Sequence, residues 1–297
     1  MKKTNNIISY TINNNHNPTT WIIWGVLTSI MLLILISSII ISIFFYRKYN
    51  KKFLTIKKIT ILATFLAIFL VQAFLTKITA DIPFLPSVDS VTTIVVGFIF
   101  GPLEGILFGW IADSLNTLIH GWSYEVLPSL MFPMIGLISG LFGVIYKKVQ
   151  DIPIWKSILI FQVIAISLLF IMIPLEIFLT NVNINGNSIS EEEFQKALFF
   201  SITSFIFIEL MMLYIRYYKL NGKEIILLML ILCVSFSERM MELVIRPFTQ
   251  YFSGYEKSYL LALYTRILRS TYLIPLVAII SFLLIRLTQF AMKNTQR

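Results

Sequence analysis

The chain has 297 residues, of which 57% are hydrophobic and only 13% charged, and its mean hydropathy is +0.83. A soluble domain carries about 25% charged residues, so this composition excludes a soluble globular protein and predicts an all-α, polytopic helical bundle in a lipid bilayer. The net charge of +9 would suit nucleic acid, but the Lys and Arg residues gather at the ends of apolar spans, as cytoplasmic loops do. We therefore expect no nucleic-acid partner.

The first predicted element is an apolar span over residues 21–46, long enough to cross a hydrocarbon core of ~30 Å. It follows a polar, Asn-rich start and ends in a dense group of Lys and Arg between residues 47 and 58. Basic loops stay on the cytoplasmic side. We therefore expect residues 1–56 to comprise an outer N-terminus, an extra membrane anchor and a basic cytoplasmic linker.

Apolar spans continue along the rest of the chain and alternate between basic and acidic or polar loops. They are predicted at 59–79, 91–100, 103–119, 127–146, 155–179, 197–218, 224–245 and 259–287. With the first span this makes nine crossings, an outer N-terminus and a cytoplasmic C-terminus. We expect a multi-pass protein of the cell membrane.

A Gly101-Pro102 turn separates two of these spans and predicts an abrupt change of direction. Proline lacks an amide hydrogen and disfavours helix in the residue before it, so one helix should end there and the next should begin with Pro102 in its first turn. Asp113 lies deep in the second apolar span. An ionisable residue at that depth is a candidate functional residue.

Two pairs of small residues are spaced four apart, on the same face of their helices. Ala63 and Ala67 lie in the 59–79 span, and Gly105 and Gly109 lie just after the turn. Small residues let helix backbones come close together. The partner is either another helix of the same chain or a separate membrane subunit, and the sequence leaves both possibilities open.

Charged residues gather in the predicted outer halves of the last two spans. They are Glu238, Glu242 and Arg246 at spacings of four, and Arg266 and Arg269 three residues apart, with the neutral Tyr272 three residues further on. Charges at that depth face each other or a polar cavity. Two interpretations stay open: the carboxylates and arginines pair with each other, or the arginines hold the carboxylates of a substrate, for which their planar fork is suited.

The aromatic residues Trp110, Trp122 and Tyr124 could pack against a ring of the same substrate, although Trp and Tyr also anchor helices at the membrane surface. Sequence motifs for zinc, serine-nucleophile and nucleotide sites are absent. The single Cys233 excludes a disulfide or thiolate metal site within one chain. We expect no catalysis, no cofactor and no metal.

Segments of the chain resemble the substrate-binding S component of an energy-coupling factor (ECF) vitamin transporter. The resemblance is carried by the 100–113 segment with its Gly-Pro-x-x-Gly sequence, the outer loop at 81–90 and the pair Ala63 and Ala67. The 264–275 segment is similar to the last helix of folate-type S components.

This resemblance implies a six-helix core, with helices one to four in 57–148 and helices five and six in 224–297. It also implies that the chain binds a vitamin, folate being favoured, at the outer face, under a lid formed by residues 81–90. A membrane T subunit, docked on the Ala63/Ala67 and Gly105/Gly109 faces, and two ATPase subunits would drive transport. The substrate-binding residues would then be those already singled out: Asp113, Trp110, Trp122, Glu242, Arg246, Arg266, Arg269 and Tyr272.

The chain departs from the family pattern in its extra N-terminal span and in a membrane hairpin inserted at 149–223. Two alternatives therefore stay open. An integral-membrane enzyme of lipid metabolism would use its carboxylates for catalysis, and a stand-alone secondary transporter would work without ATPase subunits.

Overall fold

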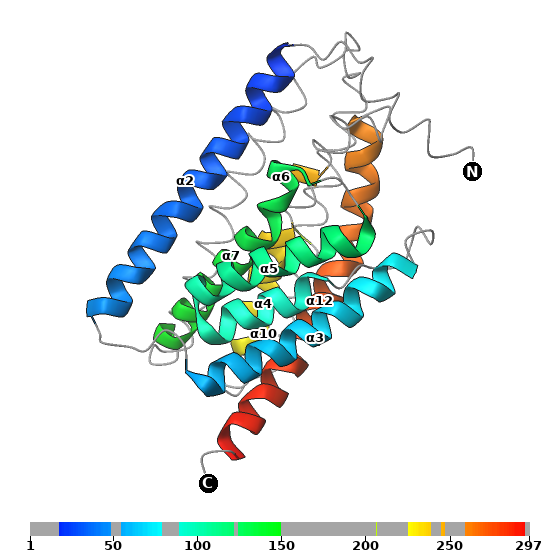
Figure 1. Ribbon diagram of the computed structural model, residues 1–297. Helices are drawn as coiled ribbons and strands as arrows, with labels where there is room; N and C mark the ends of the chain where they lie inside the picture. The colour runs from blue at the N-terminus through cyan, green and yellow to red at the C-terminus, as the bar shows by residue number, and fades with distance from the viewer. Residues whose placement is uncertain are drawn as a thin grey trace.

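The computed structural model describes residues 18–48, 55–78, 89–121, 124–149, 206, 225–238, 245–246 and 259–294. All regular elements in these ranges are helices, drawn in Figure 1. They are α2 (Pro18–Lys48), α3 (Ile56–Ile78), α4 (Ser90–Phe100), α5 (Pro102–His120), α6 (Val126–Ser129), α7 (Met131–Val149), α10 (Ile225–Glu238) and α12 (Tyr259–Asn294). The predicted spans 155–179 and 197–218 lie outside the described residues.

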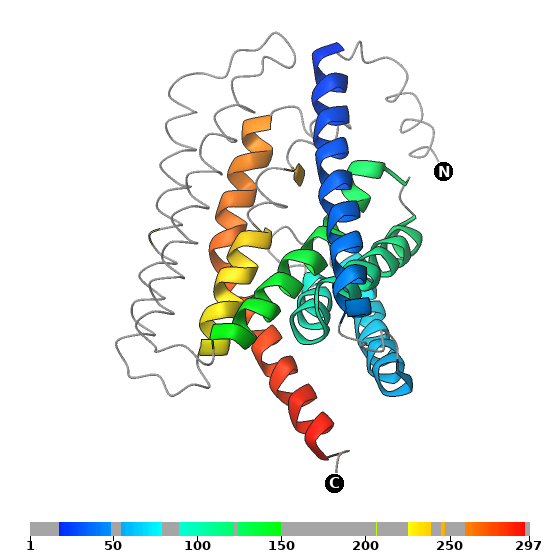
Figure 2. The ribbon, with the colours of Figure 1, turned by 90° about the vertical axis from the view of Figure 1, so that its left-hand side faces the viewer.

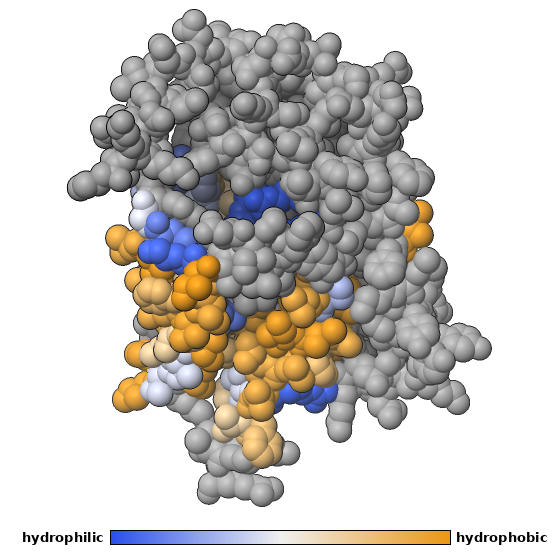
Figure 3. Space-filling view, turned by 90° about the vertical axis from the view of Figure 1, so that its right-hand side faces the viewer, coloured by the Kyte–Doolittle hydropathy of each residue, from blue (hydrophilic) through white to orange (hydrophobic). Residues whose placement is uncertain are grey.

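Among the described residues, four segments are long and apolar enough to cross a membrane: Gly25–Phe44, Lys58–Ile78, Val126–Lys147 and Leu273–Met292. The described part of the chain is thus a helical bundle of membrane-protein character. Figure 3 shows the matching surface, on which hydrophobic side chains form a wide band and hydrophilic ones gather toward its edges. The count of nine spans, the six-helix core and the sidedness of the chain stay predictions.

The Gly-Pro turn is confirmed. Helix α4 ends at Phe100, and α5 begins at Pro102. Gly101 between them has φ 121° and ψ 178°, a backbone conformation that side-chain-bearing residues rarely adopt. The glycine therefore reverses the chain, and the proline starts the next helix.

The predicted span 127–146 is interrupted, unlike its neighbours. The short helix α6 ends at Ser129, and α7 starts at Met131. Pro133 explains the break, because its nitrogen cannot donate to the carbonyl four residues earlier and its ring crowds that carbonyl. Proline is tolerated in the first turn of a helix, which is where α7 holds it.

Helices α4, α5 and α7 form the centre of the bundle, and glycine makes their approach possible. A Cβ atom added at Gly105 would lie closer than 3.0 Å to the backbone of Gly136 in α7, and one at Gly109 would lie as close to the backbone of Phe132. Buried apolar side chains surround these contacts, among them Ile94, Ile106, Leu127, Leu130 and Phe69. The backbones of α5 and α7 touch directly.

The other helices pack around this centre. Figure 2 shows α10 and α12 side by side, and α10 also contacts α7. Helix α2 lies along one flank, and the C-terminal end of α12 extends beyond its neighbours (Figure 1). Many residues of α2 remain exposed, including Leu33 and Ile40.

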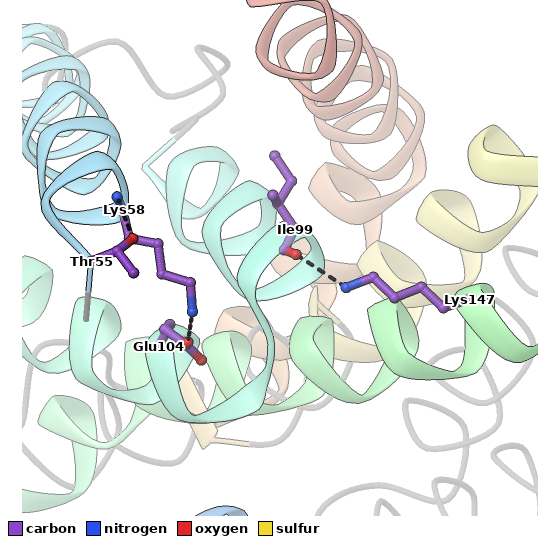
Figure 4. A network of polar contacts seen from close by, with 5 residues as sticks. All are labelled: Thr55, Lys58, Ile99, Glu104 and Lys147. Atoms are coloured by element: carbon purple, nitrogen blue, oxygen red, sulfur yellow. Dashed lines mark hydrogen bonds and ion pairs between the residues drawn. The ribbon is translucent and has the colours of Figure 1, made fainter. Parts of the chain in front are cut away.

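One end of the bundle is held by lysines (Figure 4). Lys58 of α3 lies 2.8 Å from the Glu104 carboxylate at the start of α5, and Lys147 of α7 donates to the Ile99 carbonyl of α4 at 3.3 Å. The backbone nitrogen of Lys58 also donates to the Thr55 hydroxyl, which caps α3. The helix ends that the sequence assigns to the cytoplasmic side therefore meet at one end of the bundle.

Candidate functional site

The opposite end of the bundle joins several helices through polar side chains. Ser90, at the start of α4, donates a hydrogen bond to the Glu238 carboxylate at the end of α10, at 2.8 Å. Thr76 of α3 donates to the Asp89 carboxylate. Ser90, Asp89 and Glu238 are all buried. We name this group, with the residues of α5 and the arginines described next, the polar cluster.

Helix α5 contributes two buried acceptors to the polar cluster. Asp113 is 6% exposed and Asn116 is 4% exposed. The Oδ2 atom of Asp113 and the Oδ1 atom of Asn116 are buried and accept no hydrogen bond from the residues that the structure describes. The residues are three apart, so they share a face of the helix. Within the ranges that the structure describes, this end of α5 therefore presents two buried acceptor atoms without a hydrogen-bond donor.

Arginines supply positive charge to the same cluster. Arg246 interacts electrostatically with both Asp89 and Asp113, and Arg269 of α12 interacts with Asp89. Burial raises the pKa of Asp89 above its usual range, while the hydrogen bond from Thr76 and the charge of Arg246 act in the opposite direction. The cluster thus offers both guanidinium donors and carboxylate acceptors to a small polar molecule.

The structure brings some predicted site residues together. Asp113, Arg246 and Arg269 belong to the polar cluster, and Arg266 lies one turn before Arg269 on α12, half-buried. Tyr272 lies on α12, but its side chain is outside the described residues. The predicted residues Trp122 and Glu242, and the predicted lid at 81–90 apart from its last two residues, also lie outside them.

Trp110 lies on a different side of α5. It is 37% exposed, and its neighbours Leu107 and Ile111 are exposed as well. These residues form the outward face of the helix, whereas Asp113 lies on the buried one. The structure does not bring Trp110 into the polar cluster, and the exposed position suits an anchor at the membrane surface.

The two pairs of small residues have different surroundings. Gly105 and Gly109 are buried against the backbone of α7, so their face is used for packing within the chain. This corrects the expectation that a second subunit docks on them, because α7 already covers that face. Ala63 and Ala67 of α3 are exposed.

Sequence reasoning missed Thr76 and Asn116 of the polar cluster, and it included Asp89 and Ser90 only as the end of the predicted lid. Asn116 could have been found, because it lies three residues after Asp113 on the same helix face. In the described part of the chain no group of three or more His, Cys, Asp or Glu side chains could hold a metal ion.

Comparison with known proteins adds one short similarity. The chain is 34% identical over 61 residues to the "Uncharacterized protein MG313 homolog" of Mycoplasma pneumoniae, which covers 20% of this chain and 21% of that protein. The chain therefore matches about a fifth of this relative's length. No family model and no solved structure matches the chain.

Proposed function

We propose that this chain is the membrane-embedded substrate-capture subunit of an ATP-driven vitamin importer of the ECF type. The observation that carries the proposal is the polar cluster: carboxylates, hydroxyls and arginines from several helices meet at one end of an apolar bundle. Charged groups are costly among membrane helices and are kept there mainly for function. Binding a polar molecule is the function that such a mixed set of donors and acceptors serves most directly.

The end of the bundle opposite the polar cluster suits a second role, contact with a partner subunit. There the described contacts hold helix ends together through Lys58 and Glu104. Ala63 and Ala67 leave α3 open at two small residues, where the backbone of another membrane helix could come close. We propose this face as the docking surface for a T subunit, which two ATPase subunits would drive.

For the substrate we propose an anionic vitamin, with folate as the favoured candidate. Arg246, Arg266 and Arg269 are half-buried near the polar cluster. Arginine binds carboxylates through two parallel hydrogen bonds. A molecule with carboxylates at one end and a nitrogen-rich ring at the other would use both kinds of group in the cluster.

The test is purification of the tagged full chain from its native membrane, followed by mass spectrometry of bound small molecules and co-purifying proteins. We expect one vitamin, one further membrane subunit and ATPase subunits. A bound substrate without ATPases would favour a secondary transporter instead, and turnover of a lipid by the purified chain would favour an enzyme.

A pair of matched variants tests the docking surface. The double change Ala63→Leu and Ala67→Leu should lower recovery of the membrane partner and the ATPases at least tenfold while leaving the amount of bound vitamin unchanged. Ala291→Leu, the same substitution at an exposed position of α12, is the control and should recover the partners normally. Equal recovery with all variants would remove α3 from the interface.

A further inference from the structure

The net positive charge of the chain comes from its first 80 residues. These residues include nine of the 24 Lys and Arg and none of the 15 Asp and Glu, so the remaining 15 basic residues balance the 15 acidic ones. Six of the nine lie in one short stretch, which we name the basic segment: Arg47, Lys48, Lys51, Lys52, Lys57 and Lys58. The basic segment therefore accounts for most of the net charge of +9.

Two membrane-spanning segments place the basic segment at a membrane surface. The apolar stretch of α2 ends at Phe44, and that of α3 begins at Lys58. The connection from Lys48, where α2 ends, to Ile56, where α3 begins, can reach at most about 29 Å. A hydrocarbon core is ~30 Å thick, so both helix ends lie at the same surface. Residues 49–54 lie outside the described ranges and enter here by their sequence alone.

The basic segment has more charge than membrane orientation requires. The two other basic loops predicted on the cytoplasmic side each contain an acidic residue, Asp151 in one and Glu224 in the other. In the basic segment, Lys58 lies 2.8 Å from the buried Glu104 carboxylate of α5, so this charge is neutralised within the chain. The other five basic residues have no Asp or Glu near them in the sequence. They would complement a partner that carries several negative charges.

Exposed apolar side chains beside these charges identify the kind of partner. Ile56, next to Lys57, is 86% exposed, and Ile59 is 51% exposed. Phe44 in the last turns of α2 is 64% exposed. Nucleic acid or an acidic protein would leave these side chains in water, whereas a phospholipid offers an anionic headgroup with hydrocarbon directly beneath it. The combination of charge and apolar surface favours lipid.

We propose that the basic segment binds anionic phospholipid headgroups at the surface where α2 ends and α3 begins. Each Lys or Arg near an anionic membrane surface strengthens binding about fivefold, so several together retain such lipids in preference to zwitterionic ones. The apolar side chains at the ends of α2 and α3 contact the lipid tails. This inference does not depend on the proposed function.

The test measures which lipid stays with the purified full chain. The protein is reconstituted into vesicles of equal parts phosphatidylglycerol and phosphatidylcholine with identical acyl chains, extracted again in mild detergent, and its retained lipid is quantified by mass spectrometry. Both leaflets have the same composition, so the orientation of the protein does not affect the result. We expect at least fivefold more phosphatidylglycerol than phosphatidylcholine. Equal retention of the two lipids would overturn the inference.

Salt distinguishes a lipid headgroup from a soluble phosphate. Because salt screens exposed charges, the preference should fall as the ionic strength of the extraction buffer rises, and a preference that does not fall would overturn the inference. Sodium chloride and sodium phosphate at the same ionic strength should lower the preference equally. A larger loss in sodium phosphate would indicate a site for free phosphate instead of lipid.

Charge variants assign the preference to the basic segment. The triple variant Lys51→Gln, Lys52→Gln and Lys57→Gln should lower the preference to less than twofold. The corresponding triple change to Arg keeps the charge and should retain the preference. If the Gln variant elutes like the wild type on size-exclusion chromatography and still prefers phosphatidylglycerol, the basic segment is not the site.

A matched control removes three charges elsewhere. The variant combines the changes Lys148→Gln, Lys219→Gln and Lys223→Gln, which lie in the other two basic loops. Its net charge equals that of the first triple variant, and it should keep the wild-type preference. An equal loss in both triple variants would mean that the overall charge of the protein attracts the lipid, which would overturn the assignment to the basic segment.

Discussion

The two halves of helix α5 are built for different purposes. In the first half, Gly105 and Gly109 bring the backbone of the helix into contact with α7. In the second half, Asp113 and Asn116 hold buried acceptors that receive no hydrogen bond in the described part of the chain. The tightly packed half fixes the position of the helix, and the polar half, one to two turns further on, is thereby held in place.

The two buried carboxylates of α5 show the same contrast. Glu104 forms an ion pair with Lys58, whereas the described interaction of Asp113 with a charged group is a longer-range electrostatic one with Arg246. A carboxylate with a close charged partner has a structural role in joining α3 to α5. The changes at Gly105 and Lys58 below perturb the packed half of α5, and the change at Ser90 perturbs the polar end of the bundle.

The largest effect is expected at the glycine contact. Gly105→Leu would push a side chain into the backbone of Gly136, which cannot move aside as a flexible side chain can. Overpacking ordinarily costs about 1–3 kcal/mol, and we expect more here, with loss of most folded protein on size-exclusion chromatography in detergent.

Gly25→Leu in α2 is the control for that change. A Cβ atom at Gly25 meets nothing within 4 Å, and leucine favours helix over glycine by up to about 1 kcal/mol. Yield should be unchanged or higher. If both leucine variants fold equally well, the close approach of α5 and α7 does not hold the bundle together.

The second effect concerns the ion pair. Lys58→Met leaves the Glu104 side chain, only 1% exposed, without its charged partner. Breaking a fully buried pair costs about 3–5 kcal/mol, and we expect less because the Lys58 side chain is 26% exposed. Thermal unfolding in detergent would measure the loss.

The double variant Lys58→Met with Glu104→Leu sharpens this test. Removing both charges leaves no unpaired carboxylate, so the double variant should melt at a higher temperature than Lys58→Met alone. A double variant that melts lower still would show that the Glu104 side chain stabilises the bundle through contacts other than the ion pair.

The sequence predicts those features of the fold that depend on residues close together along the chain. The break at Gly101 and Pro102 is set by the conformational limits of two adjacent residues, and Asp113 stands out because it is ionisable in an apolar span. Both could be recognised from the sequence. The interruption before α7 could also have been predicted, since Pro133 carries the signal by itself.

Contacts between distant segments could not be predicted in the same way. Ser90 and Glu238 are 148 residues apart, and nothing in a single sequence pairs them. The partner of Gly105 was ambiguous for a similar reason. Small residues allow another helix to pack closely, but they do not identify which helix packs there. Gly136 and Gly140 in α7 are also four residues apart, and this second pair of small residues could have indicated α7 as the partner.

The smallest effect is expected at that long-range contact in the polar cluster. Ser90→Ala removes the hydroxyl that donates to the buried Glu238 carboxylate at 2.8 Å. An acceptor that loses its donor costs about 1–3 kcal/mol, so the melting temperature should fall, and Ser90→Thr should restore it because it returns the hydroxyl. A Ser90→Ala protein that melts like the wild type would mean that this bond does not hold the polar end of the bundle together, and that the packing of α5 against α7 alone positions Asp113 and Asn116.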